Sequence, residues 1–460
     1  MKKFLLTAAL ALVAFASAFA VTDGQTYEPV NGIKIVNNWI LDRFHTPTVF
    51  PKAEYCNTRA RTAVMNNGVI YIARSEVKAA VVAPGDTVPQ SVIYRLDAKT
   101  GAELPALDVT LDGKPYGAFL GVNSIGRDNF GHVWVIPYTG EKAADIPVYT
   151  LNVETGELTL VTTLSKGDKI ARTDYYDVIG DITREKAECN IMNAGTQVAT
   201  IYRWHADQGA EEFEGGFEGD LSLEITAFFP ETVTNWSYAP VVKMCYDPAS
   251  ETPYAGELFY IDGFNSVPAL YDVTGSIIDS FEAVDKALYP EAGTNGVAEF
   301  TLDNRNFMVY SIAQYSGTGH GCQANIVELG EGMSLGGMTK YWQIPADSLG
   351  QTSDGGNRVH CFNVEYNDAQ DVVTLFDFKS FNGMAVYQIG KNVGGGEEPG
   401  TKGDINADGV VNVSDVTALI NKILGTATYA DATCDINADG VVNVSDVTAL
   451  INIMYYPDFG

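Results

Sequence analysis

The chain has 460 residues, of which 58 are acidic and 29 are basic, so its formal net charge is −29. This length leaves room for two or three domains and a large core. The excess of negative charge argues against nucleic acid and against anionic membrane surfaces as partners, because both require patches of lysine and arginine.

The first twenty residues have the composition of an export signal. Two lysines follow Met1, an apolar run begins at Phe4, and Ala18-Phe19-Ala20 ends it. We therefore expect residues 1–20 to be a secretory signal peptide cleaved after Ala20. A membrane anchor is the alternative, but the run is short and no basic stop follows it. Elsewhere no stretch is long and apolar enough to span a bilayer, so the sequence predicts a secreted protein, extracellular or associated with the cell surface.

Residues 21–391 show almost no helical periodicity. Short runs of β-branched and aromatic residues alternate with turns of Gly, Asn and Asp, a pattern typical of all-β domains. Six times a turn leads into such a run, at a spacing of roughly 60 residues. These turns are residues 66–68, 128–131, 193–195, 255–256, 303–306 and 367–368. A second strand often ends at a Thr-Gly hairpin, as at Thr100-Gly101 and Thr155-Gly156.

This repetition predicts a mainly β body shaped as a six- or seven-bladed β-propeller, an architecture in which radial repetition protects the sheet edges. A β-sandwich array and a β-helix are the alternatives. Residues 21–58 are the candidates for a strand that closes the ring. In pattern only, the body resembles secreted β-propeller proteins of Bacteroidetes.

No catalytic constellation is visible in the body. Gly332-Met-Ser334-Leu-Gly336 spells G-x-S-x-G, but no helical run follows, so we interpret it as coincidence. The five histidines are isolated and lack the spacing of a zinc site, and His320 is the one best placed to line an open loop. Paired carboxylates for glycoside hydrolysis are not identifiable in so acidic a chain. We interpret the acidic run 211–220 as a solvated insertion, with a second ion site as the alternative.

Aromatic side chains offer a further possibility, since sugar-binding surfaces use aromatic platforms. The tryptophans are Trp39, Trp134, Trp204, Trp236 and Trp342. Trp134 and Trp204 fall in predicted strands and are expected in the core, whereas Trp236 is expected to be more exposed. The cysteines are Cys56, Cys189, Cys245, Cys322, Cys361 and Cys434. Export permits disulfides, but buried free thiols are the preferred interpretation at this low density.

A Gly-rich linker, residues 392–401, is expected to be flexible, and it leads into a duplicated segment. Residues 404–421 recur letter for letter as residues 435–452, 31 positions later. Each copy opens with a twelve-residue loop that carries oxygen ligands at the positions a calcium loop requires. The side-chain candidates are Asp404, Asn406, Asp408, Asn412 and Asp415 in the first loop, and Asp435, Asn437, Asp439, Asn443 and Asp446 in the second.

The remaining loop positions also fit a Ca²⁺ ion. Position 6 requires a sharp turn and holds Gly409 or Gly440, where a positive φ costs little. Position 7 contributes a backbone carbonyl, from Val410 or Val441. Position 12 is Asp rather than the Glu of an EF-hand, so the helix that follows must lie closer to the ion. The sequence therefore predicts two Ca²⁺ ions, one for each loop.

An apolar helical stripe follows each loop. In the first copy it comprises Val416, Leu419, Ile420, Ile423 and Leu424, and Gly425 is a stop. In the second copy it comprises Val447, Leu450, Ile451 and Met454. No helix is predicted before either loop, whereas a full EF-hand has two helices for each loop.

This duplicated pattern of one loop and one helix resembles the type I dockerin family over residues 402–460. The resemblance implies a small all-α calcium-binding domain that docks on the cohesin modules of scaffolding proteins, typically in assemblies that degrade polysaccharide. It also implies that loop positions 10 and 11 face the cohesin, which here are Val413-Ser414 and Val444-Ser445. Because the copies are identical, two binding orientations of similar energy are expected.

The sequence therefore predicts a secreted modular protein. Its dockerin, residues 402–460, would anchor a propeller-like glycan-binding or interaction domain, residues 21–391, to a cohesin-type partner. The alternative is a polysaccharide hydrolase or lyase of propeller type tethered in the same way. Retention of the protein at the cell surface is an alternative role for the repeats.

Overall fold

A computed structural model describes the protein. The described residues of the body are 21–49, 60–118, 125–138, 145–165, 175–195, 200–205, 221–227, 241–246, 253–263, 266–280, 296–313, 322–331, 334–350, 360–367, 371–380, 382–391 and 393. Nearer the C-terminus they are 403, 405–406, 411, 413–426, 429, 431–437 and 440–455. The predicted signal peptide, and the predicted linker apart from Val393, lie outside these residues.

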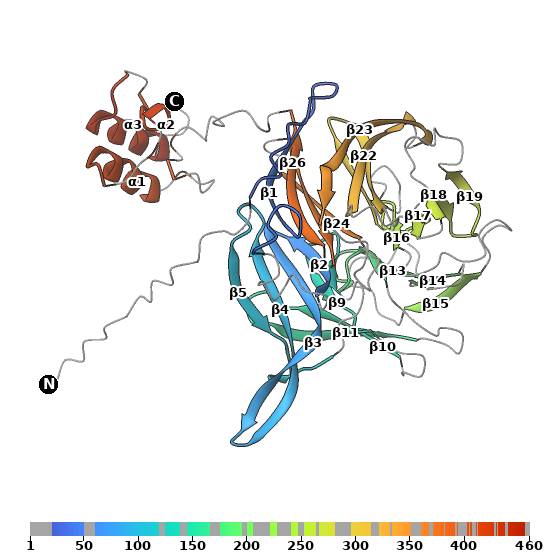
Figure 1. Ribbon diagram of the computed structural model, residues 1–460. Coiled ribbons are helices and arrows are strands. Elements are labelled where there is room, and N and C mark those ends of the chain that lie inside the picture. Colours follow the sequence, from blue (N-terminus) through green and yellow to red (C-terminus); the bar gives the residue numbers. More distant parts are fainter. Residues whose placement is uncertain are drawn as a thin grey trace. The chain divides into compact units, whose positions relative to one another are not determined.

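The chain divides into two compact units, residues 1–393 and residues 394–460. We call them the body and the C-terminal unit. Within the described residues, the strands of the body form six sheets, numbered here as blades 1 to 6 (Figure 1).

The blades follow one another along the chain. Blade 1 comprises β2 (Ala60–Asn66), β3 (Val69–Ala83), β4 (Asp86–Asp97) and β5 (Glu103–Asp108). Blade 2 comprises β6 (Thr110–Leu111), β7 (Lys114–Pro115), β8 (Ile125–Arg127), β9 (Val133–Val135), β10 (Ile146–Leu151) and β11 (Glu157–Leu164). Blade 3 comprises β12 (Tyr176–Gly180), β13 (Cys189–Ala194), β14 (Thr200–His205) and β15 (Ser222–Ala227).

Three further blades complete the body. Blade 4 comprises β16 (Val241–Met244), β17 (Leu258–Gly263), β18 (Ser266–Asp272) and β19 (Ile277–Ser280). Blade 5 comprises β20 (Val297–Leu302), β21 (Arg305–Ala313), β22 (Cys322–Gly330) and β23 (Ser334–Leu349). Blade 6 comprises β24 (His360–Asn367), β25 (Val372–Lys379), β26 (Gly383–Gly390) and β1 (Lys34–Asp42).

One edge strand of each blade faces the centre of the body. These inner strands are β2, β8, β12, β16, β20 and β24, and each contacts the inner strands of the blades before and after it, with β24 meeting β2. The ring is therefore closed, and the body is a six-bladed β-propeller. Of the predicted range of six or seven blades, the lower number is the one observed.

The N-terminal strand β1 closes the ring. It runs antiparallel to β26, with Lys34 opposite Gly390 and Asp42 opposite Gly383, and it forms the outer edge of blade 6. Blade 6 would otherwise have only three strands, and β26 would present unpaired backbone groups at its edge. The expectation that residues 21–58 contain a closing strand is confirmed.

Apolar side chains fill the spaces between neighbouring blades. Between blades 2 and 3, for example, Trp134 and Val148 pack with Val178 and Trp204 in one buried cluster. Three buried tryptophans also donate indole N–H groups to distant carbonyls. They are Trp39 to Ala98 at 2.8 Å, Trp204 to Ser165 at 2.8 Å and Trp342 to Glu28 at 2.9 Å. These indoles connect segments far apart in sequence, because a buried indole N–H requires an acceptor.

Outer hairpins of three blades use the same turn chemistry. Asp97, Asn152 and Asp272 each accept a hydrogen bond from the backbone N–H of the threonine that precedes a glycine. The glycines that follow, such as Gly101 with φ +71°, adopt the left-handed region. The predicted Thr-Gly hairpins are confirmed here. The predicted turn at residues 193–195 lies between the second and third strands of blade 3, whereas the other five predicted turns lie between the inner strand of a blade and the strand that follows it. The difference arises because β12 and the loop after it lack the local pattern.

The C-terminal unit is helical. It contains α1 (Val413–Ile423), α2 (Asp431–Cys434) and α3 (Val444–Tyr455), and α1 and α3 pack against each other. Ile405, Leu419, Ile436 and Leu450 form its core with Cys434. After α1, Gly425 adopts φ +69° and its N–H donates to the carbonyl of Lys422, so the predicted stop is confirmed.

Two details of this unit differ from prediction. The short helix α2 precedes the second loop, where no helix was predicted; a single turn there places Cys434, which is fully buried, in the core. The predicted apolar stripe of α1 is only partly buried. Leu419 is fully buried, whereas Ile420 and Leu424 are 41% and 68% exposed. The stripe is wider than the face that α3 covers.

Candidate functional site

The second loop of the C-terminal unit has the geometry of a cation loop. Gly440 adopts φ +86° and its N–H donates to a carboxylate oxygen of Asp435 at 2.8 Å, so the chain folds back at loop position 6. The carboxylate of Asp446 is fully buried and accepts hydrogen bonds from the N–H groups of Asn437 at 3.2 Å and Asn443 at 2.8 Å. The ends of the loop are therefore held together around a buried negative charge.

The first loop repeats part of this arrangement. The N–H of Asn406 donates to the fully buried Asp415 at 3.1 Å, as Asn437 does to Asp446. Of the residues predicted to bind calcium, Asn406, Asp415, Asp435, Asn437, Val441, Asn443 and Asp446 are described. Asp404, Asp408, Val410, Asn412 and Asp439 lie outside the described residues.

These residues fit a Ca²⁺ ion. Ca²⁺ takes six to eight oxygen ligands, and the second loop gathers carboxylate, amide and carbonyl oxygens within one short turn. A fully buried carboxylate whose partners are backbone N–H groups is costly unless a cation compensates for its charge. Asn443 serves the helix as well, because its Oδ1 accepts the N–H of Ser445 at 2.8 Å and caps the start of α3.

The predicted partner-binding positions are on the surface. Val413, Ser414, Val444 and Ser445 are all exposed, the two valines by 65% and 68%. Seven residues further along each helix, Ile420 and Ile451 are 41% and 38% exposed. Because positions i and i+7 lie on the same helix face, each repeat presents an apolar stripe to solvent. We call these two equivalent stripes the paired stripes.

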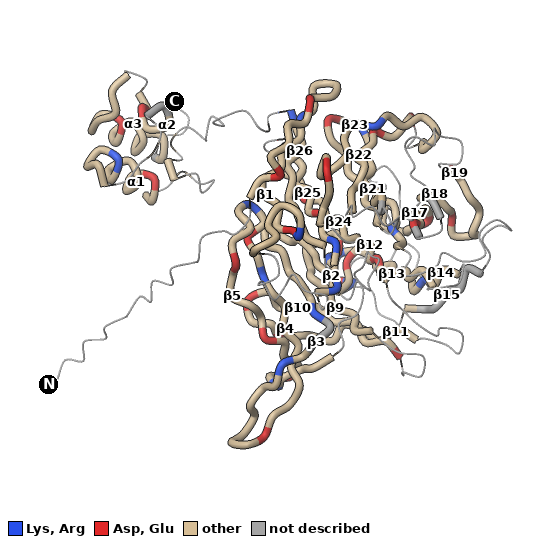
Figure 2. Tube along the Cα trace, in the orientation of Figure 1, with Lys and Arg blue, Asp and Glu red and all other residues tan. Residues whose placement is uncertain are grey.

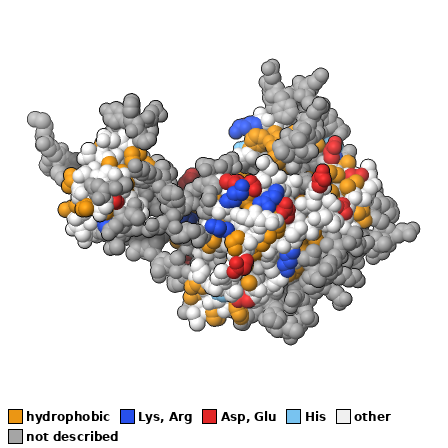
Figure 3. Space-filling view, turned by 90° about the horizontal axis from the view of Figure 1, so that it is seen from above, with side chains coloured by type: hydrophobic (Ala, Val, Ile, Leu, Met, Phe, Trp, Pro, Cys, Tyr) orange, Lys and Arg blue, Asp and Glu red, His pale blue; other side chains and the backbone are white. Residues whose placement is uncertain are grey.

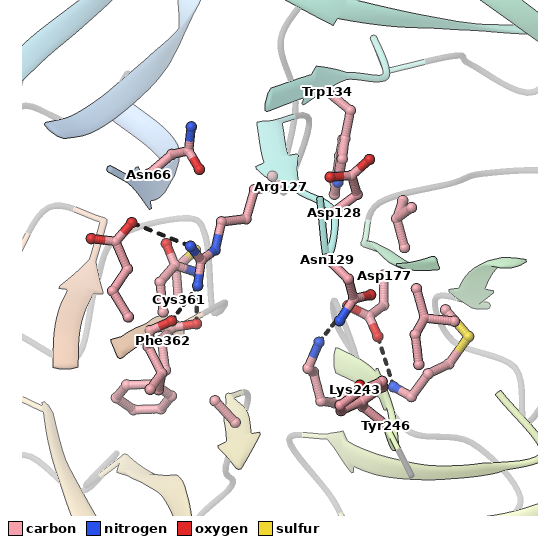
Figure 4. Close-up of a pocket in the computed structure, with 18 of the residues that line it drawn as sticks. Asn66, Arg127, Asp128, Asn129, Trp134, Asp177, Lys243, Tyr246, Cys361 and Phe362 are labelled. Atoms are coloured by element: carbon pink, nitrogen blue, oxygen red, sulfur yellow. Dashed lines mark hydrogen bonds and ion pairs between the residues drawn. The ribbon is translucent and has the colours of Figure 1, made fainter. Parts of the chain in front are cut away.

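A second candidate site lies at the centre of the body. A cavity of about 710 Å³ is lined by residues from all six inner strands (Figure 4). This volume falls within the roughly 300–1,000 Å³ that is usual for small-molecule sites. Its polar lining is provided by Asn66, Arg127, Asp177, Lys243, Glu299 and Glu365 among others. The cavity is therefore not closed by an apolar plug.

Two ion pairs join different blades at this cavity, one between blades 3 and 4 and the other between blades 2 and 6. Lys243 Nζ lies 3.0 Å from Asp177 Oδ1, whose other oxygen accepts the N–H of Met244 at 2.7 Å. Arg127 lies 3.2 Å from Glu365 and also donates to the carbonyl of Val364. Burial lowers the pKa of Arg127, although Glu365 opposes this change. Both cations are thus paired with carboxylates of other blades.

Glu299 is the most perturbed acid of the cavity. Burial raises its pKa to about 7, against the opposing effects of Lys243 and of a hydrogen bond with Cys245, while Asp177 raises it further. For Lys243, burial lowers the pKa, but the charge of Asp177 and the hydrogen bond to it, together with Glu299 and Cys245, outweigh burial, so the net shift is upward. A carboxyl group that titrates near neutral pH beside a charged lysine is able to exchange protons or to donate a hydrogen bond.

Histidines that are isolated in sequence have acidic partners in space. His132 Nδ1 lies 2.9 Å from Asp128 and 3.3 Å from Asp181. The three side chains of this cluster lie close enough together to hold a metal. The two carboxylates, however, already accept backbone N–H groups, Asp128 that of Ile182 and Asp181 that of Lys186. We interpret this cluster as a clamp between blades 2 and 3.

Ser311, His360 and Asp377 form a buried chain of hydrogen bonds. His360 Nδ1 lies 2.9 Å from Ser311 Oγ, and its Nε2 contacts Asp377. In a serine hydrolase the serine is bonded to Nε2 and the acid to Nδ1, so this order is reversed. All three side chains are at most 1% exposed. The group is a buried polar network of the core, in which Oδ2 of Asp377 has no hydrogen-bond partner among the described residues.

The other sequence candidates have simpler outcomes. Ser334 begins β23, a strand and not a helix, and its Oγ donates to Asp279 at 3.1 Å, so the G-x-S-x-G sequence is coincidence. His320, Trp236, Cys56 and residues 211–220 lie outside the described residues. Trp39, Trp134, Trp204 and Trp342 are at most 5% exposed and therefore belong to the core. The five described cysteines are free thiols, as expected.

Comparison with known proteins identifies the C-terminal unit. The family "Dockerin type I domain" matches residues 402–454. Type I dockerins bind calcium and dock on cohesin modules, so the chain is a modular protein in which a six-bladed propeller is followed by a type I dockerin. A comparison with curated proteins finds no match.

Among solved structures, the body is similar to a DUF4623 family protein from Bacteroides eggerthii DSM 20697. The TM-score is 0.52 at 11% identity, with 80% of this chain and 77% of that chain covered. At this identity the likeness concerns the fold alone. A putative 6-phosphogluconolactonase from Bacteroides fragilis NCTC 9343 has a TM-score of 0.34 at 13% identity, with 68% and 78% covered. The allergen Mala s 1 of Malassezia sympodialis has a TM-score of 0.38 at 11% identity, with 74% and 96% covered. Similarities as weak as the last two carry no argument.

Among the described residues, the helices are too short and too polar to cross a membrane.

Proposed function

We propose that this is an exported protein whose dockerin holds two Ca²⁺ ions and docks a glycan-binding propeller onto a cohesin-type partner, in the service of polysaccharide breakdown. Residues 1–20 would direct export. The proposed ligands are Asp404, Asn406, Asp408, Val410, Asn412 and Asp415 for one ion and Asp435, Asn437, Asp439, Val441, Asn443 and Asp446 for the other. The observation that carries the proposal is the equivalence of the two repeats, in loop contacts and in exposed stripes.

Calcium would act by stabilising the dockerin. When bound, the ion supplies positive charge to acidic oxygens that otherwise repel one another, and this free energy contributes to folding of the small unit. The segment 402–460 contains eight aspartates and two lysines, so two ions of charge +2 would offset most of its net charge of −6. The partner would then bind the paired stripes, with Val413, Ser414, Val444 and Ser445 at their start.

Titration calorimetry of the full-length chain, freed of metal by a chelator, tests the calcium sites. We expect two Ca²⁺ ions for each chain, and one ion after either Asp415→Ala or Asp446→Ala. Asp86→Ala, which removes an exposed carboxylate from the start of β4 in the body, is the matched control and should leave two. Absence of calcium binding, or an unchanged stoichiometry in both loop variants, would contradict the proposal.

Binding to a panel of type I cohesin modules tests the partner. Because the repeats are identical over residues 404–421 and 435–452, either stripe should be able to bind a cohesin module without the other. Val413→Asp or Val444→Asp should therefore leave binding within a few-fold, whereas the double variant should abolish it. If both single variants abolish binding, the two repeats do not act as alternatives. If no cohesin module binds in the presence of calcium, retention of the protein at the cell surface becomes the better explanation of the repeats.

The alternative function of the body, a polysaccharide hydrolase or lyase, is favoured by one observation. The central cavity holds the carboxyl groups of Asp177 and Glu299 around Lys243, a combination suited to acid–base chemistry. Reducing-sugar release from plant polysaccharides, measured beside a glycan array, separates the two functions. Release that disappears in Glu299→Gln supports an enzyme, whereas array binding without release supports a glycan-binding domain.

A further inference from the structure

The central cavity contains polar atoms that lack protein partners. Within the described residues, the buried acceptors Asn66 Oδ1 and Glu299 Oε2 and the buried donor Trp134 Nε1 have no hydrogen-bond partner. All three residues line the cavity, and Asn66 and Trp134 are only 3% and 2% exposed. Buried unsatisfied polar groups are rare because each costs about 1–3 kcal/mol. The wall of the cavity therefore holds two acceptors and one donor whose hydrogen-bonding capacity the described residues do not use.

The charges around the cavity select against an acidic ligand. Four lining carboxylates, those of Asp128, Asp177, Glu299 and Glu365, face two lining cations, Arg127 and Lys243. Both cations are already paired with carboxylates. Acidic side chains are also spread over several blades (Figure 2), and on the face shown in Figure 3 the two signs are interspersed. A phosphate or uronate group would therefore find no free cation among the described lining residues.

An aromatic platform lies beside the cavity. Tyr246 stacks on Tyr254 with ring centroids 5.4 Å apart and 25° between the planes, and Phe130 packs on Tyr254 at 5.6 Å. Phe130 and Tyr246 line the cavity, and Tyr246 is 44% exposed. Aromatic surfaces exposed beside polar groups are typical of ligand sites. We call these three residues the aromatic platform.

The backbone at Tyr254 is held by blade 3. The carbonyl of Tyr254 accepts a hydrogen bond from Asn190 at 2.8 Å, and the carbonyl of Ala255 accepts one from Arg203 at 2.7 Å. Both donors belong to blade 3, whereas Tyr254 precedes β17 of blade 4. A backbone held in this way loses little conformational entropy when a ligand binds.

From these observations we infer that the mouth of the central cavity is the binding site for a neutral oligosaccharide, with a sugar ring stacked on the aromatic platform and its hydroxyls bonded to Asn66, Asp177 and Glu299. This inference rests on the proposed glycan binding and assigns it a place and a ligand class. A pyranose has an apolar face for an aromatic ring, and its hydroxyl groups both donate and accept hydrogen bonds. Hydrogen bonds from hydroxyls to ionised carboxylates are among the stronger ones.

Calorimetry on the full-length chain in calcium tests the inference. The probes are tri- to hexasaccharides of glucose, xylose, mannose and galactose, with an oligogalacturonate as the acidic counterpart. Tyr246→Ala removes an exposed ring and is expected to leave the fold intact, which the urea midpoint would verify. Phe44→Ala removes an equally exposed ring, 42% accessible, that does not line the cavity.

We expect at least one neutral oligosaccharide to bind, and Tyr246→Ala to weaken it about tenfold, equivalent to about 1.4 kcal/mol, while Phe44→Ala has no effect. If Tyr246→Ala binds the neutral oligosaccharide as tightly as the unsubstituted protein does, the inference is wrong but the proposed glycan binding stands. Preference for the oligogalacturonate would overturn the ligand class. If none of the probes binds, both the inference and the glycan-binding part of the proposed function are wrong, while calcium-dependent docking is unaffected.

Discussion

Glu299→Gln should change how the stability of the body depends on pH. In the folded body the pKa of Glu299 is raised from 4.5 to about 7 by burial. The folded state therefore holds this proton more tightly than the unfolded chain, and the stability contributed by the protonated group is lost as pH rises from about 4.5 to about 7. The acid–base groups that surround Glu299 are Asp177, Lys243, Cys245 and Tyr260.

The size of this change in stability follows from the difference between the two pKa values of Glu299. Each tenfold change in proton affinity corresponds to about 1.4 kcal/mol, so a rise from 4.5 to about 7 gives an upper limit of roughly 3 kcal/mol. Partial solvent contact of the side chain reduces this value, and we expect about 1–3 kcal/mol. Gln has nearly the same shape and does not titrate. The free energy of unfolding of Glu299→Gln, measured relative to that of the unsubstituted protein, should therefore rise by this amount as the pH goes from acidic to mildly alkaline.

Urea unfolding at constant calcium, followed by tryptophan fluorescence, measures this difference. All five tryptophans precede residue 391 and none lies in residues 402–460, so the signal reports the body alone. Glu154→Gln, at an exposed position, controls for removal of one negative charge from an acidic chain. A stability difference for Glu299→Gln that is constant with pH, or that moves in the opposite direction, would refute the reasoning.

Three further outcomes are expected. Gly126→Ala should destabilise the body by about 1–3 kcal/mol in urea unfolding, because a Cβ there would lie 2.1 Å from the ring of Trp134. Removal of residues 21–42 deletes five buried apolar side chains, each worth about 1.5–3 kcal/mol; the body should then fail to unfold cooperatively and should aggregate. Chelation of calcium should abolish the helical circular dichroism of residues 413–455 while tryptophan fluorescence stays unchanged, and an unchanged helical signal would show that calcium does not stabilise the dockerin.

Local patterns were sufficient to predict the calcium loops and much of the propeller. The loops depend on residues within twelve positions of one another, so Asp435, Gly440 and Asp446 are recognisable from spacing alone. Hairpin turns such as Thr100-Gly101 are equally local, because a left-handed glycine and an Asx turn need only neighbouring residues. The blade count followed from counting such turns.

The central cavity could not be predicted in this way. Asp177, Lys243 and Glu299 are separated by more than 50 residues each and meet only because three inner strands converge. The aromatic platform was missed for the same reason, because Phe130 lies in blade 2 whereas Tyr246 follows β16 and Tyr254 precedes β17, and the three rings meet only in the fold. Residues that meet only when the ring closes are far apart in the sequence, so no spacing pattern reveals them.

The position of β26 has a mechanical consequence for a tethered protein. A pull transmitted from the C-terminal unit would enter the body at the end of β26, next to Gly390. That strand is hydrogen-bonded on both sides, to β25 and to β1, with Gly390 opposite both Val372 and Lys34. A load on β26 would thus act on two ladders of hydrogen bonds instead of one. The N-terminal strand β1 would therefore help β26 to resist a pulling force.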